Sequence, residues 1–173
     1  AITTAIQDGV NPALVHLTIS GTLANGTVYT LTTTNVEDLE GNAMTSQDED
    51  FAILIAETPV WGDVVINEFM CDPTPVVGLP EVEFVEIYNR SSKIFNVQNW
   101  QLWDEAASGT IQDAWLLPGE YLILTSTSYV DSFALAAVGV TGIEGLNNDE
   151  DHIVLKSDLG VPIDSLVYTD DWY

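Results

Sequence analysis

The sequence predicts an all-β protein, a β-sandwich with one short helix, preceded by a partial β-sheet segment. Three observations lead to this prediction. Apolar and polar residues alternate along short runs, as in strands with one buried face. The runs recur about every ten residues with turn residues between them, which is typical of sandwiches. The 173 residues are 46% hydrophobic and 17% charged, which excludes a disordered acidic tail.

The first strands precede a proline junction. Alternation predicts strands over 15–19 and 27–32, the second of them after the Asn25-Gly26 turn. The segment 38–42 is a cluster of turn residues, and an apolar run predicts a further strand over 51–55. Thr58-Pro59 marks a junction over 58–61, because proline has no backbone donor for a sheet and restricts the residue before it.

Strands resume after the junction, and the first of them is followed by a proline-rich loop over 72–80. They are predicted over 64–69, 83–89, 100–103, 121–124, 152–155 and 163–168. The exception is the segment 129–138, where Val130, Phe133, Ala134 and Ala137 fall at helical spacing and predict one short helix.

The charge balance excludes several classes of partner. The chain has 27 acidic and 3 basic residues, a net charge of −24. A nucleic-acid interface needs a basic footprint, and an anionic membrane surface attracts basic segments, so neither partner is expected. No apolar window of about 18 residues predicts membrane insertion. Cys71 has no second cysteine to pair with and is expected to be a small, half-buried apolar residue.

From Gly62 onward a series of sequence blocks follows in order: Val64-Val65-Ile66-Asn67-Glu68, Asp72-Pro73, 83–89, Asn99-Trp100-Gln101-Leu102, 117–124, 148–155 and 164–168. In their order these blocks resemble the lamin-tail domain. The resemblance implies an immunoglobulin-like β-sandwich over 62–173. The family usually places a terminal strand after Tyr168, so the domain is predicted to lack its last strand. Before the junction, Tyr29-Thr30-Leu31 and the turn from Val36-Glu37-Asp38 to Gly41-Asn42 follow Gly26-Thr27. Through these, residues 1–57 resemble part of a bacterial immunoglobulin-like domain of the surface-layer type, and both ends suggest a piece of a longer chain.

The resemblance implies a non-catalytic binding or tethering module in a larger exported bacterial surface protein, located extracellularly or at the cell surface. Its partner would be a protein or a cell-surface polysaccharide. Two alternatives stay open: a carbohydrate-recognition module that uses exposed aromatic residues, with or without calcium, and a structural spacer. An exposed edge strand could also pair with a second copy of the chain.

Aromatic residues are the candidates for stacking on sugars. Alternation places Trp100 in the core with Leu102, whereas the position of Trp103 on the other face stays open. Trp115 is expected to fill the core or cap one end of it. Trp61 is expected to pack between the two parts of the chain, and Trp172 to be exposed near the end.

Acidic clusters are the candidates for calcium, which takes six to eight oxygen ligands. Solvated acidic loops are the favoured interpretation, because neither loop has an EF-hand spacing. No metal site or cofactor is therefore assigned. The candidate ligands are Asn147, Asn148, Asp149 and Asp151 in one loop, Asp48, Glu49 and Asp50 in another, and Glu68, Asp72 and Glu83 across strands.

No pattern predicts catalysis, so no catalytic residue is assigned and the chain is not expected to be an enzyme. His16 and His152 both lie in strand patterns, and His16 is expected to point away from the core. Ser165 has no nucleophile-elbow pattern around it. Glu83 and Glu86 lie three residues apart in a strand, so their side chains face opposite sides and cannot share a substrate.

Overall fold

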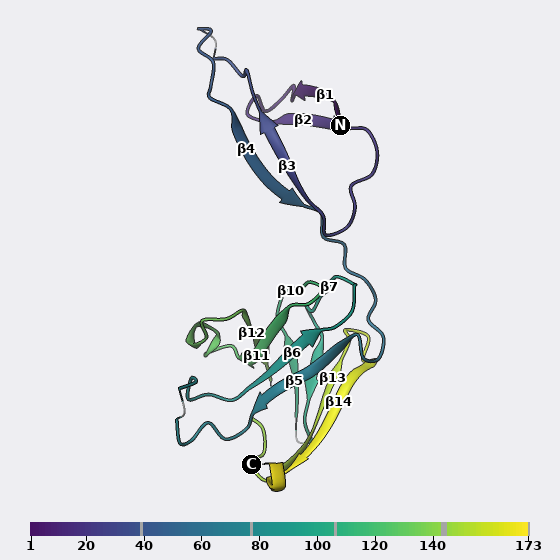
Figure 1. Cartoon of the computed structure of the whole chain (residues 1–173), viewed down its shortest axis with the longest axis vertical. Helices are drawn as coiled ribbons and strands as arrows, with labels where there is room; N and C mark the ends of the chain where they lie inside the picture. The colour runs from purple at the N-terminus through teal and green to yellow at the C-terminus, as the bar shows by residue number, and fades with distance from the viewer. Residues whose placement is uncertain (39, 77, 106, 143–144, 173) are drawn as a thin grey trace. The chain divides into compact units, whose positions relative to one another are not determined.

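The computed structural model describes residues 1–38, 40–76, 78–105, 107–142 and 145–172. The chain divides into two compact units, Ala1–Ile55 and Ala56–Tyr173 (Figure 1). Leu39 of the predicted turn over 38–42 and Tyr173 of the predicted domain over 62–173 lie outside the described residues. The residues 58–61, predicted as a junction, belong to the second unit.

The first unit contains two antiparallel hairpins. Strand β1 (Ile2–Gln7) pairs with β2 (Val15–Ile19), and β3 (Val28–Thr33) pairs with β4 (Gln47–Ala52). The strand predicted over 51–55 instead runs over 47–52, because the acidic segment Asp48-Glu49-Asp50 pairs with β3 in spite of its polarity. None of the described residues of this unit is buried, so it has little core of its own and is marginal as an isolated sheet.

The second unit is built on one eight-stranded sheet, and its strand order is β14-β13-β8-β9-β12-β11-β6-β5. The strands are β5 (Val64–Met70), β6 (Phe84–Asn89), β8 (Gln101–Trp103), β9 (Ser108–Ile111), β11 (Tyr121–Ser126), β12 (Ala137–Thr141), β13 (Glu150–Lys156) and β14 (Pro162–Thr169). A separate pair, β7 (Phe95–Asn96) and β10 (Trp115–Leu116), lies beside them (Figure 1).

The two end strands of this sheet meet, so the sheet nearly closes on itself. The backbone N–H of Gly62 donates to the Ile163 carbonyl at 2.8 Å. The N–H of Ile66 donates to Asp164 Oδ2, also at 2.8 Å. Figure 1 shows β5 and β14 side by side in this unit. The closure produces two facing layers around one core and confirms the predicted all-β sandwich.

The core follows the alternation of the strands. Trp100 is 2% exposed and packs against Phe95, with ring centroids 5.6 Å apart. Ile87 on β6 and Ile123 on β11 are buried as well. Cys71 is fully buried rather than half-buried. The prediction that Trp100 fills the core is therefore confirmed.

The short helix predicted over 129–138 is reduced to one turn. A 3-10 turn, η1, covers Val130–Ser132, and Phe133 after it already has extended backbone. Ala137 begins β12, which runs parallel to β11. Parallel neighbours need a crossover connection, and the segment 127–136 supplies it. Of the residues at helical spacing, Val130 and Phe133 are half-buried and Ala134 is exposed, and Phe133 packs edge-on against Phe84 with ring centroids 5.6 Å apart.

Candidate functional site

A hollow of about 330 Å³ opens where β6 begins and β11 ends. These two strands are antiparallel neighbours, with Thr125 opposite Phe84, so both reach the same end of the sandwich. We call this hollow the end pocket. It is lined by Pro73, Glu81, Val82, Glu83, Phe84, Val85, Leu102, Leu124, Thr125, Ser126, Tyr129, Val140, Gly145 and Leu146.

The floor of the end pocket is the hydrophobic core itself. Val85, Leu102, Leu124 and Val140 come from four different strands, and each is at most 2% exposed. The hollow therefore reaches between the layers, and its volume is at the lower end of the range for small-molecule sites, about 300–1,000 Å³. Such a floor favours an apolar group.

The rim is polar, and Glu83 is held in place there from two sides. Its Oε2 accepts a hydrogen bond from the Leu146 N–H at 2.7 Å, and its carbonyl accepts one from Thr125 Oγ1 at 2.9 Å. Gly145 lies beside the carboxylate with a φ of +132°, and a Cβ there would be 2.8 Å from Glu83 Oε2. Only glycine therefore suits both the backbone and the space at this position.

The electrostatics of the rim favour a cation. Partial burial raises the pKa of Glu83, the Leu146 amide opposes this, and the charge of Asp72 raises it further. Asp72 itself has a lowered pKa, because the hydroxyl and amide of Thr74 donate to it at 2.8 and 3.0 Å. The described residues of the lining include two glutamates and no lysine or arginine. A positive group in the pocket would therefore relieve unfavourable negative charge.

Of the three acidic residues that were candidate calcium ligands across strands, Asp72 and Glu83 lie near each other and Glu68 lies elsewhere on the sheet. Asp72 and Glu83 are near enough for their charges to interact, while Glu68 lies opposite Glu86 on the β5–β6 pair. In the part of the chain that the structure describes, no three acidic, histidine or cysteine side chains converge as metal ligands.

Asp151 is buried rather than solvated, at 3% exposure. Its carboxylate accepts hydrogen bonds from the backbone N–H groups of Glu105, His152 and Asn147 at 3.1, 2.7 and 3.1 Å. These bonds hold its loop against the segment after β8. Its neighbours Asn148 and Asp149 are exposed, as a solvated loop predicts.

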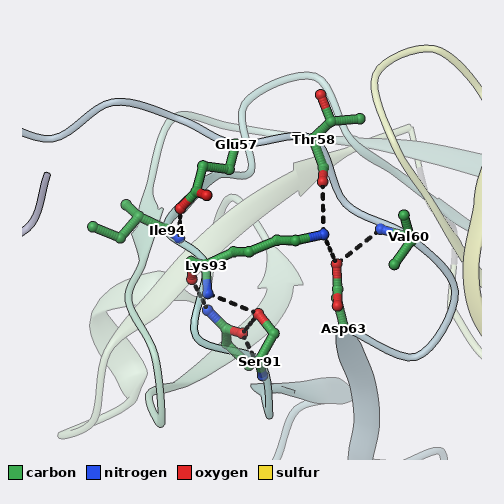
Figure 2. Close-up of polar contacts among 8 residues, drawn as sticks. Glu57, Thr58, Val60, Asp63, Ser91, Lys93 and Ile94 are labelled. Atoms are coloured by element: carbon green, nitrogen blue, oxygen red, sulfur yellow. Dashed lines mark hydrogen bonds and ion pairs between the residues drawn. The ribbon is translucent and has the colours of Figure 1, made fainter.

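A second polar group, which the sequence analysis missed, fixes the start of the sandwich unit (Figure 2). Lys93 Nζ contacts Asp63 Oδ2 at 2.7 Å and the Thr58 carbonyl at 3.2 Å. Glu57 Oε2 accepts from the Ile94 N–H at 3.0 Å, and Asp63 Oδ2 also accepts from the Val60 N–H at 2.9 Å. We call these residues, Glu57, Thr58, Val60, Asp63, Lys93 and Ile94, the junction cluster.

The junction cluster depends on charge pairing at a partly buried position. Burial by itself would raise the pKa of Asp63, but the hydrogen bonds from Lys93 and the Val60 amide outweigh it and lower the pKa. The buried Asn89 holds the loop that follows it and carries Lys93. Its Nδ2 donates to the Lys93 carbonyl, and its Oδ1 accepts from the Ser91 amide and hydroxyl. The feature of the sequence that could have indicated this cluster is Lys93, one of three basic residues in the chain, which lies shortly after the predicted strand over 83–89.

The exposed tryptophans differ in what covers them. Trp103 is 38% exposed, but Lys156 Nζ lies 3.3 Å from its ring centroid and covers one face. Trp61 and Trp172 are exposed, and the ring of Trp172 lies 6.2 Å from that of Phe69. The predicted packing of Trp61 between the two parts stays a prediction.

Of the two positions predicted for Trp115, the core is wrong, because its side chain is 36% exposed, and the capping of one end stays a prediction. Together with Tyr121 it lines a second hollow of about 600 Å³. We call it the aromatic groove. Tyr121 stacks on Tyr88 with centroids 4.5 Å apart. Glu86 and Asn67 also line the groove and are joined by a 2.8 Å hydrogen bond. Glu83 and Glu86 therefore face different hollows, as the strand spacing predicted.

The histidines and the serine lie outside both hollows. His16 is exposed on the first unit and contacts Asp8 at 2.7 Å. Hydrogen bonds from the Asn11 amide, His16 and the Val10 amide lower the pKa of Asp8 to about 2. His152 is exposed on β13, and Ser165 lies on β14 opposite Val154.

Comparison with known proteins identifies one family. The model of the Lamin Tail Domain matches residues 57–170, which begins with the first residue of the junction cluster and covers all eight strands of the large sheet. No curated protein matches the chain. Among the described residues, no helix has the length and apolar character needed to cross a bilayer.

Proposed function

The chain belongs to the lamin tail domain family, and from this premise we propose that it is a non-catalytic binding or tethering module of a larger exported bacterial surface protein. The observation that carries the proposal is the end pocket, an apolar hollow with a polar rim on a nearly closed sandwich. Pockets of this kind, with few polar groups around an apolar floor, are the usual binding sites of small domains.

The chemistry of the rim supports binding rather than catalysis. Glu83 is hydrogen-bonded to a backbone amide, and the described lining residues include no histidine or cysteine. The net charge of −24 keeps such a module in solution and repels anionic polymers.

A titration followed by NMR tests this proposal. The neutral probe 1-butanol should shift the backbone signals of Leu102, Leu124 and Val140. Ser126→Phe, which places a ring in the pocket, should abolish those shifts. Ser128→Phe, two residues further along and outside the lining, is the matched control and should preserve them. If the wild-type signals do not move, the end pocket is no binding site and the proposal fails.

Saccharide recognition is the second candidate, and the aromatic groove favours it. The exposed ring of Tyr121 and the half-exposed Trp115 flank Glu86 and Asn67, a combination of stacking faces and polar acceptors. A glycan array with wild type and Tyr121→Ala tests it. Binding that disappears in the variant supports this function, and an array without hits on wild type leaves the spacer role as the alternative to tethering.

Calcium binding is part of this second candidate function, because saccharide recognition was proposed with or without calcium. Asp48, Glu49 and Asp50 lie on successive positions of β4, so their side chains alternate between its faces, and Asp50 accepts from Thr30 Oγ1 at 2.6 Å. Calorimetry with millimolar calcium measures it directly. Neither heat nor a change in melting temperature would remove calcium from the account.

A further inference from the structure

The end pocket combines two features that one ligand group rarely satisfies at once. Its floor is made of aliphatic core side chains, and its rim carries Glu81 and Glu83, with no basic side chain among the lining residues that the structure describes. A purely apolar group would leave the rim charges unpaired. A small cation would not fill the floor. The group that fits has an apolar stem and a positive end.

The hydrogen bond that Glu83 already accepts favours lysine over arginine as the positively charged side chain in the pocket. Oε2 already accepts the Leu146 N–H at 2.7 Å, and among the described residues no donor reaches Oε1. Arginine gains its advantage over lysine from bidentate pairing with both carboxylate oxygens. An ammonium is a point charge that needs a single oxygen, and its four-carbon stem buries well along apolar surface.

We infer that the end pocket receives a lysine side chain of a protein partner, with its stem on the Leu102–Leu124–Val140 floor and its ammonium at Glu83 Oε1. The inference rests on the proposed binding function and specifies its ligand. A chain with a net charge of −24 also attracts basic partners over long range, which raises the rate of encounter.

Matched probes test the inference. The peptides acetyl-Gly-Leu-Lys-Leu-Gly-amide and its norleucine analogue differ only in the ammonium, and n-butylamine reproduces the lysine side chain alone. The lysine peptide should bind at least tenfold more tightly than the norleucine peptide, with shifts at the pocket floor. Its affinity should fall with added salt, since the charge pair is partly exposed. Affinity should rise as the pH increases through the ionisation of Glu83.

The variants separate charge from packing. Glu83→Gln keeps an oxygen for the Leu146 amide and should reduce lysine-peptide affinity to the norleucine level. Glu68→Gln removes the same charge from β5, away from the lining, and should change affinity less than twofold. If Glu83→Gln lowers the melting temperature strongly, Glu81→Lys on the exposed rim provides the second variant, and it should weaken the lysine peptide at least fivefold.

The outcomes of these experiments distinguish the lysine assignment from the proposed binding function on which it rests. If both peptides bind in the pocket equally well, or if butyrate competes as effectively as n-butylamine, the lysine assignment is overturned and the binding function stands. If neither the peptides nor 1-butanol shifts the pocket signals, the binding function is overturned together with it.

Discussion

Replacing Lys93 by methionine is the sharpest test of the physical reasoning about this fold. The substitution keeps most of the side-chain stem but removes the ammonium that joins Asp63 and the Thr58 carbonyl in the junction cluster. Asp63 then keeps only the Val60 amide as a side-chain partner among the described residues. Its carboxylate stays charged at neutral pH at a site where its side chain is 14% exposed.

The expected loss lies between that of a surface ion pair and that of a buried one. Surface pairs contribute ~0–1 kcal/mol, whereas stranding one member of a fully buried pair costs ~3–5 kcal/mol. The side chains of Lys93 and Asp63 are 31% and 14% exposed, so we expect an intermediate loss of ~2 kcal/mol in the free energy of unfolding. For a domain of this size that corresponds to a melting temperature lower by about 8 °C.

Tryptophan fluorescence isolates the right unit for this measurement. All five tryptophans lie after residue 55, so a urea titration followed by their emission reports on the sandwich unit alone. Arg90→Met is the matched control. It removes the same charge from the same loop, but in the described part of the chain the Arg90 side chain forms no ion pair. The control should differ from wild type by less than ~0.5 kcal/mol.

The pH dependence provides an independent check. The folded-state pKa of Asp63 is lowered, so its contribution to stability is present above its ordinary range and is lost as the pH falls through the folded-state value. The difference between wild type and Lys93→Met should therefore shrink in acid. Equal stability of Lys93→Met and Arg90→Met at pH 7, or a difference that persists in acid, would refute the reasoning.

Four further predictions concern the core, the pocket and the first unit. Trp100→Ala should lower the free energy of unfolding by ~3–5 kcal/mol in the same urea titration, because it empties a fully enclosed site; a loss below ~1 kcal/mol would contradict core packing. Gly145→Ala should displace the Glu83 carboxylate, since the new Cβ would lie 2.8 Å from Oε2, and NMR shifts at the pocket should report it; unchanged shifts would disprove this steric role. Asp8 contributes to the stability of the first unit above its ordinary pKa of 3.8, and this contribution should be lost as the pH falls toward about 2. His16→Ala should raise the pKa of Asp8 only part of the way to its ordinary value, because the Val10 and Asn11 amides still donate to the carboxylate. A carboxyl titration followed by NMR measures this pKa. If the variant shows the full ordinary value, His16 alone lowers the pKa and the reasoning about the amides is wrong.

Much of the fold was predictable because strand formation and burial leave local marks. The alternation in Val15–Ile19 identified β2, the run over 64–69 identified β5 to within one residue of its end, and the spacing of Trp100 and Leu102 placed both in the core. The six-residue strand β1 and the short strands β7, β9, β10 and β12 escaped prediction. Strands of two to five residues carry too little alternation to be recognised without their partners.

The candidate site was less predictable, since its parts are far apart in the chain. Glu83 was singled out as an acid that could converge with others, but nothing near it indicates that Leu146, 63 residues later, supplies its hydrogen bond. Asp151 was grouped with solvated acids, although three backbone amides bury it. Backbone donors are present at every residue, so the sequence does not reveal which of them a carboxylate will meet.

The sequence by itself therefore determined the class of the fold, the principal strands, the tryptophan at its centre and the strongly acidic charge, because each depends on composition or on neighbours within a few residues. Only the tertiary structure decided that β12 lies parallel to β11, that Lys93 holds Asp63, and that an acid-rimmed pocket opens above the core. These features arise when chain closure brings distant segments together, and their free energy comes from contacts that exist only after the sheet has formed.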